Sequence, residues 1–394
     1  MTSTLRPAVL WPLALLVGTG VFFLTCLVEP AETHTLNFGA EYGEMAKAPL
    51  ALVGKFPHRV LGPLVAHVLG FAGERYWMFA HGCTALLIAM IFAAAVHFGA
   101  RWWQAMLLTT VIAFTGTIQI YKGHVGYPDP ITFLLLTATL MAARRPGLFW
   151  SLQALNLLNH EQILFFWPWL LYWRHRSGGE VGGARGLPDV VGGVVVASAY
   201  VLLRLVVGAE AQGQTLTMAH YLGLTYFPVG TLGLAVLNLG STFIWFGLLP
   251  VLIFWHAFAD GWQRAGAGIV LFVLCQHAMF GVAHDVYRFT CFLFVPLLFA
   301  GLRLVQRPHG AIILAALGAA SVGAIVLQRE VFVKIAITVM QNLPDTVPAI
   351  VPKVIPELWG TFTLYGIALL ASAGIGFAWA RRDRGVLGAG AADS

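Results

Sequence analysis

The sequence predicts an all-α, polytopic membrane protein with about ten or eleven transmembrane or re-entrant helices. Hydrophobic residues make up 59% of the 394 residues and charged residues 10%, whereas a soluble domain has roughly 45–50% apolar and about 25% charged residues. Apolar segments close to the roughly twenty residues that a spanning helix needs recur along the chain. No segment alternates over about ten residues as barrel strands do, so we expect helical spans.

The expected helical segments are separated by short connections. They lie at about residues 8–28, 76–98, 103–120, 130–143, 148–172, 189–208, 234–258, 266–283, 286–304, 310–327 and 360–380. Tryptophans near segment ends, among them Trp77, Trp150 and Trp359, suit the aromatic belt of a membrane interface. The cysteines lie within apolar segments without CxxC spacing, which indicates packing residues.

Basic residues beside the segments predict the orientation, because cytoplasmic connections carry an excess of Lys and Arg. Arg144 and Arg174 flank segment 148–172, so a single full crossing would place them on opposite sides. A break near residues 156–161, with return to the side of entry, removes this conflict. Both termini are then cytoplasmic in a bacterial-type inner (plasma) membrane. The external connections are 29–75, 121–129, 209–233, 284–286 and 328–359.

One integral-membrane domain is expected over residues 1–384, followed by a flexible tail at 385–394. The external loop 29–75 carries a helix-like stretch that starts at Arg59, is too short to span, and is expected along the interface. The net charge of +6 comes mainly from helix ends, which indicates orientation and not nucleic-acid binding. No phosphate-loop, dinucleotide-binding or zinc-protease motif occurs, so an activated substrate should be lipid-borne.

Two acids in the first external loop are candidate bases. Glu41 and Glu44 are one helical turn apart, so a local helix would let both face one cavity and take a proton from an acceptor. The alternative is a pair of solvated acids, with Lys47 paired to Glu44. Glu41, Glu44 and His124 are also potential ligands of a divalent metal, although their spacing matches no recognised site.

Two further candidate groups lie later in the chain. Arg59, with His58 beside it, is expected at headgroup level, where a guanidinium can hold a phosphate or simply anchor lipid headgroups. Glu161 lies in an apolar segment, so its carboxylate needs a partner, either His160 or a basic residue from another segment. A structural polar lock and a substrate contact are both open for this acid.

The tight connection before the segment at 130–143 contains Lys122, His124, Tyr127 and Asp129. Asp129, which precedes a proline, is a candidate N-cap as well as a candidate catalytic carboxylate. No structural role is evident for Lys122 or His124, so we expect them to contact a phosphate or a sugar.

The last candidate cluster, His284, Asp285, Tyr287 and Arg288, stands at the outer tip of a tight hairpin. Asp285 and Arg288 are close enough in sequence to pair with each other on one helical turn. The other interpretation is that Asp285 holds Arg288 within reach of a lipid phosphate, because a buried charge pair is a poor stabilising device.

These motifs together resemble the GT-C superfamily of integral-membrane glycosyltransferases, which take sugars from polyprenyl-phosphate or polyprenyl-pyrophosphate carriers. The resemblance rests on the Pro-His-Arg-Val-Leu-Gly-Pro-Leu stretch at 57–64, the connection 122–129, the polar break and aromatic-Pro run at 158–168, and the loop 284–288. It implies a carboxylate base from the first loop, acceptor or sugar contacts from His124 and Asp129, and phosphate contacts from Arg59 and Arg288.

The resemblance implies transfer of a sugar to a glycan, lipid or protein acceptor on the external face by one displacement that inverts the anomeric carbon. The acid of that family usually lies closer behind the first helix than Glu41 or Glu44 does, so the identity of the base stays open. A secondary transporter, or another outer-face enzyme of lipid-linked glycans such as a ligase or polymerase, is the competing interpretation. A transporter built from repeats would carry a second helix break in its other half, and none is evident.

Overall fold

The computed structural model describes residues 6–35, 38–52, 56–177, 186–210, 242–259, 266–280, 286–341 and 367–382. Helices make up 84% of the structure, and the described residues contain no strand. The all-α prediction is therefore confirmed.

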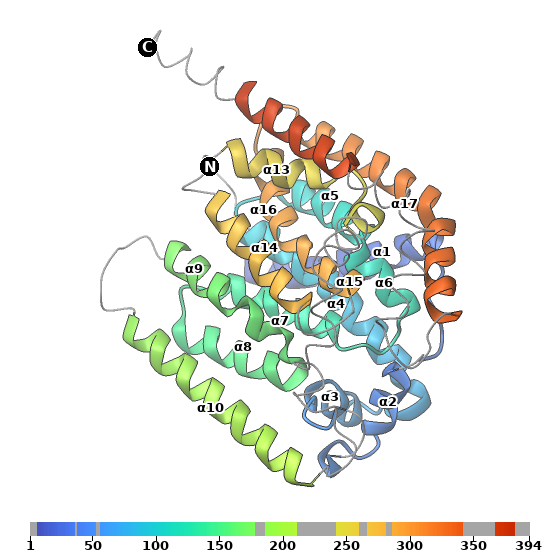
Figure 1. Cartoon of the computed structure of the whole chain (residues 1–394), viewed down its shortest axis with the longest axis vertical. Coiled ribbons are helices and arrows are strands. Elements are labelled where there is room, and N and C mark those ends of the chain that lie inside the picture. Colours follow the sequence, from blue (N-terminus) through green and yellow to red (C-terminus); the bar gives the residue numbers. More distant parts are fainter. Residues whose placement is uncertain are drawn as a thin grey trace. The chain divides into compact units, whose positions relative to one another are not determined.

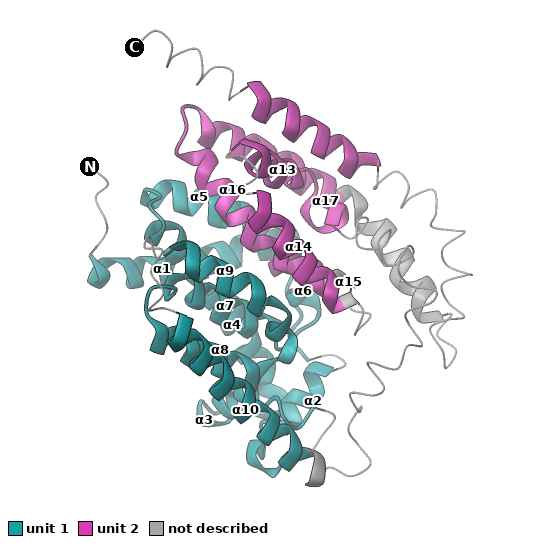
Figure 2. Ribbon diagram, turned by 60° about the vertical axis from the view of Figure 1, so that its left-hand side comes forward, with its two compact units in different colours: residues 1–113, 118–217 teal, residues 114–117, 218–394 magenta. Residues whose placement is uncertain are grey.

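The chain divides into two compact units, coloured separately in Figure 2. Unit 1 comprises residues 1–113 and 118–217, and unit 2 comprises residues 114–117 and 218–394. The prediction of one membrane domain over 1–384 stays a prediction, and the tail 385–394 lies outside the described residues.

Unit 1 is a series of neighbouring helices in which α1 packs on α4, α4 on α7, α7 on α8 and α8 on α10 (Figure 1). The helices are α1 (Pro7–Val28), α2 (Phe38–Met45), α3 (Leu61–Val68), α4 (Tyr76–His97), α5 (Trp102–Ala113), α7 (Asp129–Met141), α8 (Pro146–Asn159), α9 (Trp167–Ser177) and α10 (Gly186–Glu210). Short 3-10 helices are η1 (Pro49–Ala51), η2 (Gly73–Arg75) and η3 (Glu161–Phe166). Helix α6 (Gly116–Gly123) has its first residues in unit 2 and the rest in unit 1.

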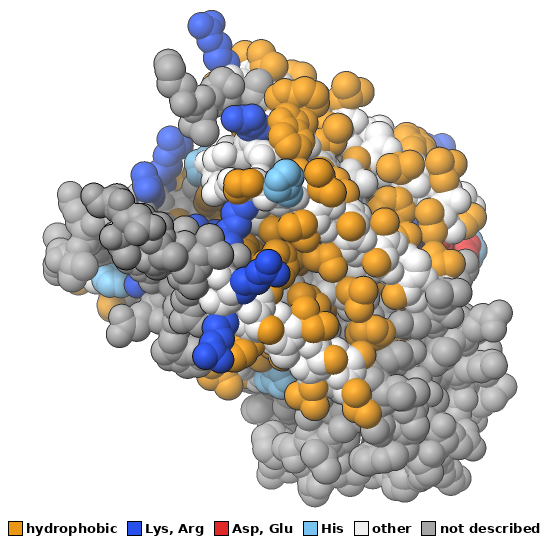
Figure 3. All heavy atoms as spheres, turned by 90° about the horizontal axis from the view of Figure 1, so that it is seen from above, with side chains coloured by type: hydrophobic (Ala, Val, Ile, Leu, Met, Phe, Trp, Pro, Cys, Tyr) orange, Lys and Arg blue, Asp and Glu red, His pale blue; other side chains and the backbone are white. Residues whose placement is uncertain are grey.

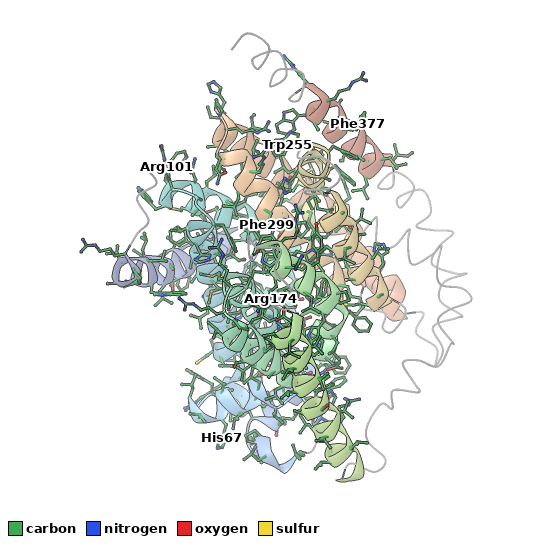
Figure 4. The ribbon with its side chains drawn as sticks, turned by 90° about the vertical axis from the view of Figure 1, so that its left-hand side faces the viewer. His67, Arg101, Arg174, Trp255, Phe299 and Phe377 are labelled. Carbon is green, nitrogen blue, oxygen red and sulfur yellow. The ribbon has the colours of Figure 1, made fainter. Side chains whose placement is uncertain are left out.

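Unit 2 is built around α16, which packs against α13 and α17. Its elements are α13 (Pro250–Ala259), α14 (Ala267–Phe280), α15 (Val286–Thr290), η5 (Cys291–Leu293), α16 (Phe294–Val305), α17 (Gly310–Gln341) and a helical segment at 367–382. Aromatic contacts join α13 to that last segment, since the rings of Trp255 and Trp379 stack at 4.8 Å and those of Phe258 and Phe377 meet at 5.2 Å (Trp255 and Phe377 are labelled in Figure 4).

Several helices are long and apolar enough to cross a membrane. Among the described residues these are Pro7–Val28, Gly73–His97, Gly186–Val207 and Arg288–Val305, with Trp102–Ala113 and Gly116–Gly123 forming a fifth if that pair, bent by 50°, is one span. The structure is thus compatible with a multi-pass membrane protein. The full number of spans stays a prediction, because three expected segments, 234–258, 266–283 and 360–380, lie partly outside the described residues.

The surface supports contact with lipid. Only 11% of the apolar window of α10 and 33% of that of α1 is buried inside the protein. Large apolar side chains such as Leu16, Leu27, Val190 and Leu202 are exposed, and Figure 3 shows hydrophobic side chains spread over the face it displays. A soluble monomer rarely exposes contiguous apolar surface of this kind, whereas hydrocarbon can cover it.

The segment after α8 contains a helix break within the predicted stretch 156–161. Helix α8 ends at Asn159, and His160 is extended, with φ −160° and ψ 126°, before η3 and α9 follow. At the end of α9, the backbone oxygen of Ser177 accepts a hydrogen bond from Arg144 Nε at 3.1 Å. The chain therefore returns to the end of unit 1 from which α8 started, and the side of the membrane on which that end lies stays a prediction.

Small residues allow α1 and α4 to approach closely. A Cβ atom on Gly18 would lie 2.6 Å from the Ala85 carbonyl oxygen and 2.7 Å from the Ala89 Cβ. A Cβ on Gly20, two residues further along the same helix, would meet nothing within 4 Å. Close packing of small residues is a principal source of association between helices in a membrane.

We therefore predict that Gly18→Ala destabilises the protein, by about 1–3 kcal/mol as overpacked sites do. Gly20→Ala is the matched control, because it makes the same chemical change on the same helix without the contact. Thermal unfolding of detergent-solubilised protein checks this, and equal midpoints for the two variants would contradict close packing of α1 on α4.

Candidate functional site

Segments predicted to share the external face meet at one end of unit 1. The Phe38 ring lies 5.4 Å from that of Phe56 and 5.9 Å from that of Tyr127, so α2 joins the segment before α3 to the connection before α7. The local packing is tight, since a Cβ on Gly39 would lie 1.9 Å from the Val125 carbonyl oxygen. His67, labelled in Figure 4, ties α3 to α2 through its Nδ1, which lies 2.8 Å from a backbone oxygen at the end of α2.

An ion pair between Arg59 and Glu161 forms the centre of this end. Arg59 Nε donates to Glu161 Oε2 at 2.9 Å and Nη2 donates to Oε1 at 2.5 Å, so both carboxylate oxygens are engaged. Arg59 Nη1 donates to the Tyr42 hydroxyl at 2.9 Å, and the guanidinium lies 4.1 Å above the Phe56 ring. The Arg59 side chain is 8% exposed and that of Glu161 is 29% exposed. The partner of Glu161 is thus a basic residue from another segment, one of the two sources that the sequence left open.

His58 connects this pair to α10. Its Nε2 lies 3.3 Å from Glu161 Oε2, and Arg204 Nη1 lies 2.7 Å from each nitrogen of the ring. Because arginine can only donate and a neutral imidazole has one acceptor nitrogen, only one of the two contacts with Arg204 can be a hydrogen bond. We assign Nδ1 as the acceptor from Arg204, since the Nε2 proton can then be directed to Glu161. His58 is then a neutral bridge between a carboxylate and a second guanidinium.

The environment lowers the pKa of His58 and raises the pKa of Arg59. Burial is the largest influence on His58 and lowers its pKa below 6.5, against the opposing hydrogen bond with Glu161. Burial also acts to lower the pKa of Arg59, but the attraction of the Glu161 carboxylate outweighs it and leaves that pKa raised. At neutral pH the group therefore holds two guanidinium cations, one carboxylate and a neutral His58.

His160, predicted beside Glu161, is buried and lies at the helix break. Its Nδ1 accepts a hydrogen bond from the Gln162 backbone N–H at 3.3 Å and lies 3.6 Å from Glu161 Oε2. Just before it, Asn159 Nδ2 donates to the Pro128 carbonyl at 2.8 Å. These polar side chains thus bind backbone groups at the break and attach it to the start of α7.

The two candidate bases have different surroundings. Helix α2 exists, as the one-turn spacing required, yet Glu44 is 65% exposed and pairs with Lys47 at 2.7 Å. Glu41 is half-buried, and its Oε2 is buried without a hydrogen-bond partner among the described residues. The expectation that both acids face one cavity is therefore not met, and Glu41 is the acid directed toward the protein.

The contacts of Lys122 contradict the prediction that this residue has no structural role. Its side chain is fully buried, and Nζ donates to the carbonyl oxygens of Thr25 at 2.8 Å and Glu29 at 2.7 Å, at the end of α1. Basic side chains commonly bind the last carbonyl groups of a helix in this way. The expectation that Lys122 lacks a structural role is wrong, because its ammonium holds the end of α1 against α6.

The other residues of the 122–129 connection lie at the same end of unit 1. His124 and Tyr127 are half-buried, with ring centroids 5.5 Å apart. Asp129 is fully buried, but α7 begins at this residue, and its N-cap is Pro128 without a side-chain capping bond. The N-cap prediction for Asp129 is therefore wrong by one position, and the acid instead lies in the first helical turn, where the helix dipole favours a negative charge.

The predicted late cluster belongs to unit 2. Arg288 is buried, at 4% exposure, on α15. Tyr287 belongs to the same helix, but its side chain is not described, and His284 and Asp285 lie outside the described residues. The pairing of Asp285 with Arg288 stays a prediction.

A metal site is not evident in the part of the chain that the structure describes. No group of three or more His, Cys, Asp or Glu side chains there is arranged to hold an ion. The potential ligand set Glu41, Glu44 and His124 consequently does not form a group of that kind.

Two residues that contact His58 or Arg59, namely Arg204 and Tyr42, were not predicted from the sequence. Arg204 is a basic residue inside an apolar segment, a signal that could have identified it, because such charges are costly in a membrane. Tyr42 gave no signal, since nothing in its neighbourhood indicates that its hydroxyl meets Arg59.

No protein-family model, no curated protein and no solved structure matches this chain. The GT-C resemblance accordingly rests on the residues quoted above.

We predict that Glu161→Gln destabilises the protein by about 3–5 kcal/mol, because it leaves the buried Arg59 without its counter-charge. Glu44→Gln, which breaks the exposed pair with Lys47, should cost about 0–1 kcal/mol. Denaturant unfolding in mild detergent measures both. The single variant Arg59→Gln and the double variant Arg59→Gln/Glu161→Gln complete the test. If the loss of unfolding free energy in the double variant equalled the sum of the losses in the two single variants, the two residues would not be coupled.

We also predict that acid destabilises the protein through His58. Below its ordinary pKa of 6.5 the unfolded His58 takes up a proton that the folded one resists, so stability is present above that pH and falls on acidification toward the folded pKa. Melting temperatures from about pH 7.5 to about pH 5.5 test this. His58→Gln should flatten the dependence, whereas His34→Gln, with an exposed ring, should leave it unchanged. Parallel curves for all three proteins would exclude His58 as the source.

Proposed function

We propose that the protein is an integral-membrane glycosyltransferase that transfers a sugar from a polyprenyl-phosphate carrier to a glycan, lipid or protein acceptor. The observation that supports this most is the Arg59–Glu161–His58–Arg204 cluster, which carries one positive charge in excess beside the candidate acids. Such a charge suits an anionic carrier, and guanidinium groups bind phosphate oxygens through paired donors.

The chemistry we propose is one displacement at the anomeric carbon. Glu41 takes the proton of the acceptor hydroxyl or amine, the acceptor atom bonds to the anomeric carbon, and the bond from that carbon to the phosphate oxygen breaks. The electron pair leaves on the polyprenyl phosphate, where cationic side chains stabilise the developing charge. Inversion of the anomeric centre follows from a single displacement.

The assignment of Glu41 as base rests on its surroundings. One of its carboxylate oxygens is buried without a hydrogen-bond partner among the described residues, whereas Glu44 is exposed and paired with Lys47. Glu41 also precedes Tyr42, whose hydroxyl accepts from Arg59, so its helix is attached to the cluster. The donors of Arg59 are engaged by Glu161 and Tyr42, so we propose that Arg59 orients these two residues and does not itself bind the carrier phosphate or anchor lipid headgroups. Asp129, His124 and Tyr127 are proposed as acceptor or sugar contacts at the same end.

The proposed setting is the inner (plasma) membrane of a bacterial-type cell, with both termini in the cytoplasm and the site on the external face. Membrane lipids surround the helices, and the sugar-bearing carrier approaches from the outer leaflet. Arg288 is proposed as a phosphate contact, as the resemblance implies.

We predict that Glu41→Gln abolishes transfer while the protein still folds, because the amide cannot take the acceptor proton. Mass spectrometry of lipid extracts measures the effect, with the polyprenyl-phosphate sugar accumulating in cells that carry only this variant. Glu74→Gln removes an equal charge from an exposed position and is the control.

The companion variant Glu44→Gln separates the two candidate bases. Retained transfer with Glu44→Gln assigns the base to Glu41, and the reverse pattern assigns it to Glu44. An unchanged carrier pool in cells that lack the protein altogether would overturn the glycosyltransferase proposal.

A further inference from the structure

The two charged side chains that the structure describes on α10, Asp189 and Arg204, have different partners. Asp189, in the first turn, accepts hydrogen bonds from Arg174 Nε at 2.6 Å and from Trp150 Nε1 at 3.3 Å. Arg204, toward the other end, lies within 4.0 Å of no carboxylate among the described residues. Its side chain is half-buried in a helix whose other described side chains from 190 to 207 are uncharged.

The Glu161 carboxylate, which His58 links to Arg204, is not available to pair with Arg204. Both oxygens of Glu161 are already engaged by Arg59 in a two-point ion pair. Arg204 instead contacts His58, whose neutral ring accepts from it. The Tyr200 hydroxyl on the same helix is a second, uncharged partner of Arg204. A guanidinium carried by a membrane-spanning helix with only uncharged partners is costly, and such residues usually mark a substrate or ion site.

We propose that Arg204 binds the phosphate group of a lipid-linked ligand, with His58 as the residue that positions its guanidinium. The inference rests on the proposed function in one respect, the identification of that ligand as the polyprenyl-phosphate carrier. The chemistry itself, a phosphate ester at the membrane surface, is shared with ordinary anionic lipid headgroups.

The geometry explains why Arg204 and not Arg59 takes this role. Arg59 directs Nε and Nη2 to Glu161 and Nη1 to Tyr42, and its side chain is only 8% exposed. Arg204 contacts His58 through Nη1, which fixes one edge of a planar group that carries five N–H donors. The remaining N–H groups of Arg204 can therefore bind a phosphate in an orientation that His58 has already set. The ion pair between Arg59 and Glu161 stays intact.

Binding to full-length protein in a neutral detergent tests the proposal. The probes are a polyprenyl monophosphate, the corresponding phosphate-free polyprenol, phosphatidylglycerol and inorganic phosphate, with intrinsic tryptophan fluorescence as the readout. Arg204→Gln should weaken binding of the polyprenyl monophosphate at least about tenfold, as expected for loss of a charged hydrogen bond. Arg204→Lys, which keeps the charge but not the fork, should weaken it less.

Arg75→Gln is the matched control, because it removes the same charge from an exposed residue in the predicted external segment. It should leave the affinity close to that of the unmodified protein. Equal affinities for Arg204→Gln and Arg75→Gln would overturn the role of Arg204 while leaving the proposed function intact. The Arg204→Lys protein provides the same comparison if Arg204→Gln does not fold.

The remaining outcomes separate the two sources of phosphate. Preference for the polyprenyl monophosphate over phosphatidylglycerol, lost in Arg204→Gln, supports a carrier site. Equal, Arg204-dependent binding of both lipids supports the phosphate site but removes its selectivity for the carrier. Binding of the polyprenol as tightly as its phosphate would overturn the proposal, because recognition would then not involve the anion.

Discussion

The ion pair between Arg59 and Glu161 is the interaction on which the end of unit 1 formed by α2, α3 and η3 depends. It joins residues 102 positions apart in the sequence, so it connects the segment before α3 to the start of η3. Two parallel hydrogen bonds fix the direction of both side chains as well as their distance. Tyr42 then binds the third edge of the Arg59 group, and His58 joins the same carboxylate to α10. Removing Glu161 would leave the buried Arg59 without its counter-charge.

The helix break at His160 makes this pair possible. An uninterrupted helix from Pro146 to Ser177 would be about 48 Å long, well beyond the roughly 30 Å of a hydrocarbon core. The extended conformation of His160 instead turns the chain, and Ser177 returns to Arg144. A break of this kind frees backbone polar groups, and side chains such as Asn159 and His160 bond to nearby backbone groups around it.

The sequence predicted what depends on local pattern and missed what depends on distant contacts. Apolar segments indicate helices, and polar residues inside one of them located the break near His160. The partner of Glu161 stayed open between a neighbour and a remote base, because no local spacing relates position 161 to position 59. The role of Lys122 was missed for the same reason, since its acceptors belong to α1, more than ninety residues earlier. Exposure, which separates Glu41 from Glu44, likewise follows from tertiary packing.

The contrast between Asp189 and Arg204 of α10 separates a structural contact from the proposed binding site. Asp189 forms an ion pair with Arg174, so its charge is already neutralised and needs no ligand. At Arg204, by contrast, two guanidinium groups meet one carboxylate and a neutral imidazole, so one positive charge remains in excess. Attraction of an anion is strongest where water does not screen it. A leaving phosphate gains charge as its bond to the sugar breaks, so a preset cation at this place would stabilise the transition state more than the bound substrate.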